Sequence, residues 1–156
     1  MSDTEHNPFR SGMLMEHPAD PCVLIIFGGT GDLAQRKLFP SLVHLVREGR
    51  VSEQTQFLCV SRKDLDENSF RAEVIGNARK LAPDSIPDEE FAQKFANRIF
   101  TVTDAGDNGR FDKLRWRLGE MAGAGGAKKH FRFFFTSPSG TSAKQSHVVC
   151  LCIYST

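Results

Sequence analysis

Residues 22–33 read CVLIIFGGTGDL, and this stretch decides how the rest of the chain is interpreted. It opens with an uninterrupted apolar run that is short and rich in β-branched residues, which is typical of a strand buried on both faces of a parallel sheet. Glycines follow at positions 28, 29 and 31, and a segment with helical periodicity comes after them. A strand, a glycine turn and a helix form the context in which a glycine-rich loop indicates phosphate binding.

The chemistry of this turn follows from what glycine lacks. Without a Cβ, glycine adopts backbone angles that other residues avoid, and a pyrophosphate can approach the main chain. The free N–H groups of the next helix then point at the phosphates, and the helix dipole favours their charge. The spacing from Gly28 to Gly31 is Gly-x-x-Gly, so on this motif alone a tight turn without a ligand is the alternative. No Gly-Lys-Ser/Thr follows, which excludes a P-loop.

The longer segment 27–42, FGGTGDLAQRKLFPSL, resembles the N-terminal coenzyme-binding motif of the glucose-6-phosphate dehydrogenase family. That family opens its nucleotide domain with Gly-x-x-Gly-Asp-Leu-Ala, a basic cluster and an aromatic-Pro pair. The resemblance implies an α/β fold, a Rossmann-like doubly wound parallel sheet that forms the coenzyme domain only. Gln35 stands where the family commonly has Lys. The NADP-binding residues implied in this segment are Gly28, Gly29, Thr30, Gly31, Asp32, Leu33, Ala34 and Gln35.

The end of a second predicted strand, 56–60, indicates which dinucleotide binds. It is followed by Ser61, Arg62 and Lys63. In a dinucleotide-binding fold, an acid at this strand end binds the ribose hydroxyls of NAD, whereas an Arg accommodates the additional phosphate of NADP. The planar guanidinium of Arg62 suits a phosphate through two parallel hydrogen bonds. Ser61 and Arg62 therefore complete the predicted NADP site, and the resembled family also places an Arg here.

Lys37 is the predicted substrate-binding residue. It lies one turn into the helix that leaves the glycine loop, beside Arg36. A solvated charge is the ordinary role of such a lysine. The family resemblance implies instead that Lys37 lies where the coenzyme and the sugar phosphate meet.

The remaining pattern alternates helices and strands, which favours a parallel sheet with right-handed crossovers. The first helix runs from Asp32 or Leu33 to Glu48, and Pro40 should kink it or remove one hydrogen bond. Asp32 is a candidate cap of that helix, and Asp64 of the second, 66–81. The second helix has a predicted buried stripe of Phe70, Val74, Ala78 and Leu81. Further predictions are a short helix opening at Asp88, a strand at 98–102, a helix at 111–121 and a strand at His130–Phe135.

Three segments are expected: a mobile arm at 1–20, an NADP-binding domain at 21–136 and an unmatched tail at 137–156. The apolar run 148–154 in the tail is either a strand or the product of a misread frame. The formal net charge is +1, so neither nucleic acid nor a membrane surface is an expected partner. The four Cys lack metal-ligand spacing, so no metal site and no disulfide are predicted. The polar first twenty residues lack the apolar core of a signal peptide, and a cytoplasmic location is expected.

The resemblance implies an oxidoreductase of the oxidative pentose phosphate pathway, in which a His removes the C1 hydroxyl proton of glucose 6-phosphate. In the family this His lies in a motif of the type Arg-Ile-Asp-His-Tyr-Leu-Gly-Lys, and none of the five His here has those surroundings. No catalytic residue is therefore predicted, the chain alone is expected to be inactive, and glucose 6-phosphate binds only if a further domain is supplied.

Two function classes remain. One is the N-terminal part of an NADP-dependent glucose-6-phosphate dehydrogenase, and the other is a non-catalytic module that binds NADP(H) or a partner subunit, including another copy in a homo-oligomer. A short-chain dehydrogenase is disfavoured, because that chemistry needs a Lys four residues after a Tyr. The only Tyr, Tyr154, lies two residues from the last residue of the sequence.

Overall fold

The computed structural model describes residues 20–104, 111–123, 130–135 and 151–153. Within these ranges, five strands form one sheet in the order β3-β2-β1-β4-β5. Four of them are parallel: β1 (Cys22–Phe27), β2 (Gln56–Ser61), β3 (Ile99–Thr103) and β4 (His130–Phe135). The short β5 (Leu151–Ile153) pairs antiparallel with β4, so the sheet is mixed at that edge.

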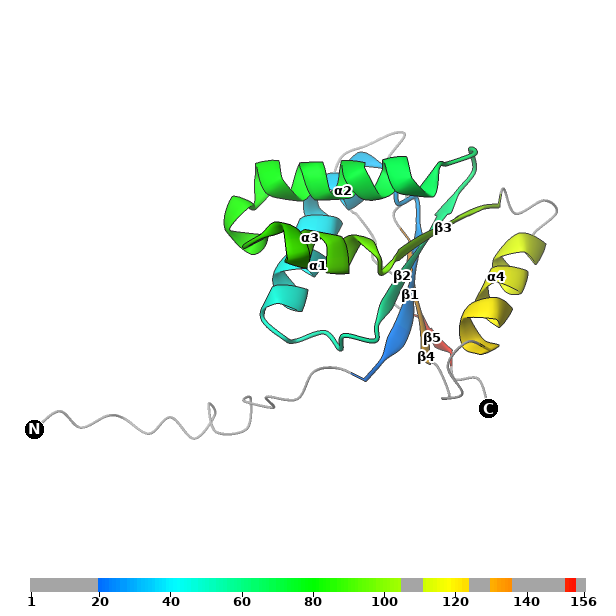
Figure 1. The fold of residues 1–156 in the computed structure, drawn as a ribbon. Helices are drawn as coiled ribbons and strands as arrows, with labels where there is room; N and C mark the ends of the chain where they lie inside the picture. The colour runs from blue at the N-terminus through cyan, green and yellow to red at the C-terminus, as the bar shows by residue number, and fades with distance from the viewer. Residues whose placement is uncertain (1–19, 105–110, 124–129, 136–150, 154–156) are drawn as a thin grey trace, which may run out of the picture.

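Helices cover both faces of the sheet (Figure 1). On one face lie α1 (Phe39–Arg47), α2 (Glu67–Leu81) and α3 (Glu89–Ala96), with a 3₁₀ turn, η2 (Pro83–Ser85), between the last two. On the other face lies α4 (Asp112–Gly123). This arrangement confirms the predicted doubly wound α/β fold.

The central strand β1 explains why its sequence is apolar at every position. Alternate side chains of a strand point to opposite faces, and each face of this sheet is covered. Leu24 and Ile26 pack with α1, α2 and α3, whereas Val23 and Ile25 pack with α4. The first cluster is the larger, and its fully buried aromatic side chains are Phe39, Phe57, Phe70 and Phe95.

The first helix accommodates Pro40 through a wide turn. Residues Ala34–Leu38 form a π-helical segment, η1, in which the Phe39 N–H bonds to the carbonyl of Ala34, five residues back. Proline has no N–H, and its ring clashes with the carbonyl four residues back in a regular helix. The wider turn before Pro40 removes that conflict, which is how the structure resolves the predicted kink or lost hydrogen bond.

Two predictions about the second helix are wrong. Asp66, rather than Asp64, caps α2, because its carboxylate accepts a hydrogen bond from the Ser69 N–H at 2.8 Å. Hydrogen bonds from Ser69 hold the pKa of Asp66 below its ordinary value. Asp64 instead accepts a hydrogen bond from the Thr103 hydroxyl. Leu81, expected in the buried stripe, is 53% exposed, because it is the last residue of α2 and a 3₁₀ turn follows.

Side chains of α2 close the outer edge of the sheet at β3. The Arg71 Nε donates to the Ile99 carbonyl at 2.8 Å, and the Glu67 carboxylate accepts from the Thr101 N–H at 2.9 Å. Arg71 and Glu67 also pair with each other at 2.7 Å. An unpaired strand edge can pair with a strand of another chain. At β3 the Ile99 carbonyl and the Thr101 N–H are instead hydrogen-bonded to side chains of α2.

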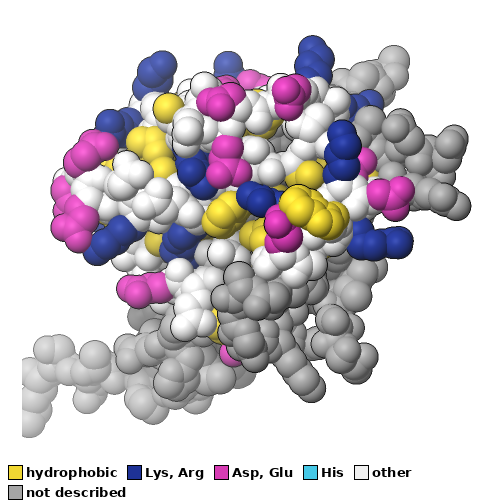
Figure 2. Space-filling model, turned by 45° about the vertical axis from the view of Figure 1, so that its right-hand side comes forward, with side chains coloured by type: hydrophobic (Ala, Val, Ile, Leu, Met, Phe, Trp, Pro, Cys, Tyr) yellow, Lys and Arg dark blue, Asp and Glu magenta, His cyan; other side chains and the backbone are white. Residues whose placement is uncertain are grey.

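The surface drawn in Figure 2 intersperses Lys and Arg with Asp and Glu, in keeping with the near-zero net charge. Trp116 on α4 is 66% exposed, so it lies outside the stripe that packs on the sheet. Within the described ranges, no helix combines the length and apolar character that crossing a membrane requires. Those same residues contain no group of three or more His, Cys, Asp or Glu side chains that could hold a metal ion.

Candidate functional site

The glycine loop follows β1 at the carboxyl edge of the sheet. Gly28 has a φ of 73°, in the left-handed region that favours glycine. Its N–H reaches the Val60 carbonyl of β2 at 3.3 Å. The Gly31 N–H then bonds back to the Gly28 carbonyl at 2.9 Å and closes the turn. The loop therefore leaves β1 through a backbone conformation that a side chain would strain.

The second glycine permits close packing beneath the loop. A Cβ on Gly29 would lie 3.1 Å from both the Cβ and the Sγ of Cys59, and 3.6 Å from the ring of Phe70. Burial raises the pKa of the Cys59 thiol, and the nearby charge of Glu67 adds to that shift. Cys59 is therefore a neutral, apolar neighbour that supports the loop from below, as the sequence predicts for a buried thiol.

Backbone donors at the start of the helix are available for an anion. Among the described residues, no acceptor is found for the N–H groups of Thr30, Asp32 and Leu33. These groups lie at the positive end of the helix that η1 and α1 continue, where negative charge is favoured. The Asp32 carboxylate does not cap this helix; it pairs with Arg36 at 2.8 Å, and both side chains are exposed. Ala34 is buried, so only its backbone can serve a ligand.

The tip of β2 lies beside the glycine loop. Phe27 of β1 is in register with Val60 of β2, so the two strands end at one edge. Ser61 is buried, and its hydroxyl accepts a hydrogen bond from the Lys63 N–H at 3.2 Å. Arg62 is exposed and, within the part of the chain that the structure describes, forms no ion pair. Its guanidinium is therefore available to an anionic ligand next to the loop.

Lys37 lies on η1 and is also exposed. Like Arg62, it forms no ion pair with any residue whose placement is described. The structure thus brings the predicted loop residues and the β2 tip together at the carboxyl edge, and it places Lys37 one helical turn beyond the loop.

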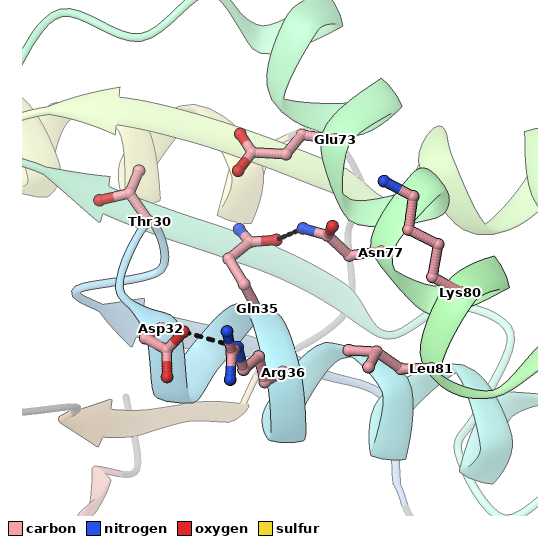
Figure 3. A pocket seen from close by; sticks show the side chains of 8 residues that line it. All are labelled: Thr30, Asp32, Gln35, Arg36, Glu73, Asn77, Lys80 and Leu81. Carbon is pink, nitrogen blue, oxygen red and sulfur yellow. Dashed lines mark hydrogen bonds and ion pairs between the residues drawn. The ribbon is translucent and has the colours of Figure 1, made fainter.

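A polar pocket of about 670 Å³ opens between the glycine loop and α2 (Figure 3). Gln35, only 6% exposed, lies at its base. The Gln35 Nε2 donates to the Gly29 carbonyl at 2.9 Å, and the Gln35 Oε1 accepts from the Asn77 Nδ2 at 2.9 Å. Sequence reasoning missed the contribution of α2, because its residues are far from the motif in the chain. The pocket is lined by Thr30, Asp32, Gln35, Arg36, Glu73, Asn77, Lys80 and Leu81.

The fold and the residues at the carboxyl edge of the sheet define the class of this domain. A doubly wound sheet, a glycine loop between its central strand and first helix, and a basic strand tip beside that loop are the features of a dinucleotide-binding domain. Residues 25–148 match the family model described as "Glucose-6-phosphate dehydrogenase, NAD binding domain". The chain belongs to this family, which supports the predicted oxidoreductase class and NADP as its coenzyme. The match extends beyond residue 136, the predicted last residue of the coenzyme domain.

Curated relatives agree with this assignment. The glucose-6-phosphate 1-dehydrogenase of Chlamydia pneumoniae is 32% identical over 130 residues, which cover 81% of this chain and 25% of that protein. The enzyme of the same name from Mycolicibacterium smegmatis is 41% identical over 87 residues, which cover 55% of this chain and 17% of that protein. The chain therefore spans a quarter or less of the length of these relatives.

Solved structures show the same fold. A glucose-6-phosphate dehydrogenase in complex with its substrate glucose-6-phosphate aligns with a TM-score of 0.66 and 24% identity, covering 75% of this chain and 24% of that one. The glucose-6-phosphate 1-dehydrogenase from Mycobacterium avium aligns with a TM-score of 0.57 and 22% identity, covering 78% and 24% respectively.

Proposed function

We propose that this chain is the NADP-binding N-terminal part of a glucose-6-phosphate dehydrogenase. The observation that carries the proposal is the juxtaposition of the glycine loop and Arg62 at one carboxyl edge, joined by the hydrogen bond from Gly28 to Val60. A glycine loop with free backbone donors and an exposed guanidinium at the same edge of the sheet suit a ligand with two separate phosphate groups. NADP has a pyrophosphate and a 2′-phosphate, whereas NAD lacks the second.

The proposed roles follow from what each group can donate. The free N–H groups of Thr30, Asp32 and Leu33 receive the pyrophosphate, and Arg62, beside Ser61, receives the 2′-phosphate. The three glycines let the ligand approach the main chain. Ala34 and Gln35 follow the loop in the first turn of the helix and are buried beneath it. Lys37 is proposed to meet the phosphate of the sugar substrate.

The proposed reaction divides between this chain and residues that it does not contain. NADP⁺ bound by these residues would supply the hydride acceptor for oxidation of glucose 6-phosphate at C1. The C1 hydroxyl proton must pass to a base, and no His of this chain lies in the surroundings that the family uses for that step. The residues present bind and orient the coenzyme. Homo-oligomerisation and a cytoplasmic location belong to the same proposal, as expectations from the sequence.

Replacing Arg62 with alanine tests the coenzyme assignment. We expect NADP⁺ binding to weaken by about 1.5–3 kcal/mol, the usual contribution of hydrogen bonds to a charged group. Binding of NAD⁺ should not change, because that ligand has no 2′-phosphate. Calorimetric titration of wild type and Arg62→Ala with both coenzymes measures the difference.

Arg50→Ala is the matched control, since Arg50 is an exposed arginine that pairs with Glu48 beyond the end of α1. It should bind NADP⁺ as the wild type does. Equal losses for NADP⁺ and NAD⁺ in Arg62→Ala would contradict the assigned role. Absence of NADP⁺ binding in a folded wild-type chain would overturn the site as a whole.

Turnover separates an enzyme from a binding module. The purified chain is expected to bind NADP⁺ without reducing it in the presence of glucose 6-phosphate, because it lacks the family's base. The rise of NADPH absorbance measures this directly. Robust turnover would show that another residue of this chain serves as the base.

A further inference from the structure

We propose that Gln35 and Asn77 are positioning residues that orient the Gly29–Thr30 peptide toward the coenzyme's pyrophosphate. This inference rests on the proposed NADP site. It assigns to Gln35 an indirect role, because both polar atoms of its amide already form hydrogen bonds within the protein. Figure 3 shows the hydrogen bond with Asn77.

The orientation of the Gln35 amide is determined by its neighbours. The Gly29 carbonyl can only accept a hydrogen bond, so the Gln35 NH₂ must face it. The Gln35 oxygen then faces α2, where Asn77 donates to it from 42 residues further along the chain. Asn77 thereby prevents the amide from turning over. The two hydrogen bonds therefore run in one direction, from Asn77 to Gln35 and from Gln35 to Gly29.

Holding the Gly29 carbonyl also sets the next N–H group. In a trans peptide the C=O and the following N–H point in opposite directions, and the residues that the structure describes include no cis peptide. A carbonyl drawn toward Gln35 therefore turns the Thr30 N–H away from it. That N–H has no acceptor among the described residues. Gly29, on one side of this peptide, accepts more orientations than a residue with a side chain would, and the buried amide of Gln35 selects one of them.

The test compares two ligands that share the 2′-phosphate. NADP⁺ has a pyrophosphate for the loop, whereas adenosine 2′-phosphate engages Arg62 and has none. Gln35→Met keeps the length of the side chain and removes both hydrogen bonds. We expect the Kd for NADP⁺ to rise about tenfold and the Kd for adenosine 2′-phosphate to stay within about twofold of wild type.

A second variant, Asn77→Asp, replaces the hydrogen-bond donor on α2 with an acceptor. In Asn77→Asp the carboxylate can only accept, so it should draw the Gln35 NH₂ toward α2 and turn the Gln35 oxygen to the Gly29 carbonyl. NADP⁺ binding should fall at least as far as in Gln35→Met, again without loss of adenosine 2′-phosphate binding. Gln93→Met is the control, because it removes a similar side-chain hydrogen bond, from the Gln93 amide to Asn97, on the exposed side of α3. It should leave both Kd values unchanged.

The outcomes separate this inference from the proposed function. Loss of both ligands to the same extent in Gln35→Met and Asn77→Asp would show a merely structural pair and overturn the inference. An unchanged NADP⁺ affinity in either folded variant would overturn it too, while the NADP site would stand. If wild-type protein binds adenosine 2′-phosphate and not NADP⁺, the proposed function fails and the inference fails with it.

Discussion

Replacing Gly28 with valine is expected to weaken NADP⁺ binding by about two orders of magnitude. Gly28 has a φ of 73°, and a β-branched residue is strained there by about 1–3 kcal/mol. The chain would relieve that strain by moving the loop, so the N–H groups of Thr30, Asp32 and Leu33 would lose their common direction. Each hydrogen bond to a charged phosphate contributes about 1.5–3 kcal/mol, so a partial loss suffices. Calorimetric titration measures the effect.

Gly49→Val is the control that separates backbone strain from the site. Gly49 ends the first helix with a φ of 68°, and a Cβ there would meet nothing within 4 Å. The control should lose a comparable free energy of unfolding and retain NADP⁺ binding. If both variants bind NADP⁺ like the wild type, the loop conformation is not required for the coenzyme.

The largest effect on stability is expected from Phe39→Ala. Phe39 is fully buried and packs edge-on against Phe70, with ring centroids 5.8 Å apart. Truncating a buried Phe costs about 3–5 kcal/mol through lost transfer energy and the cavity that remains. A domain is typically stable by only about 5–15 kcal/mol, so the variant should be close to unfolding. Urea denaturation followed by circular dichroism measures the change in free energy.

Phe111→Ala provides the comparison. Phe111 makes a similar edge contact with Phe27, at 5.6 Å between ring centroids, but it is 37% exposed. Its truncation should cost clearly less than that of Phe39. Equal costs for the two would mean that the packing beneath the first helix does not dominate the stability of this domain.

The sequence predicts the fold well where the pattern is local. The apolar run before Gly28 predicts β1, and the structure confirms it over Cys22–Phe27. The sequence predicts that Asp88 opens a helix, and its carboxylate caps α3 by accepting a hydrogen bond from the Phe91 N–H. For the second helix, Asp64 and Asp66 are both acceptable cap residues, and only the course of the backbone after β2 selects Asp66.

The network behind the candidate site is not local, which is why the sequence does not reveal it. Gln35 belongs to the recognisable motif, but its two partners lie on the loop and on α2, and nothing in either segment indicates the other. The π turn is an intermediate case. Pro40 predicts a disturbance of the helix, whereas the form of that disturbance depends on how Phe39 packs into the core.

The central place of β1 has a consequence for hydrogen exchange. This strand is paired on both sides, with β2 and β4, and its side chains are buried on both faces. Amides in such a strand exchange with solvent only when the whole domain opens. The glycine loop follows β1 directly, so the strand that holds it in place belongs to the part of the sheet that opens last. A coenzyme bound at the loop should therefore slow the exchange of the most protected amides, through global unfolding, as well as that of the loop itself.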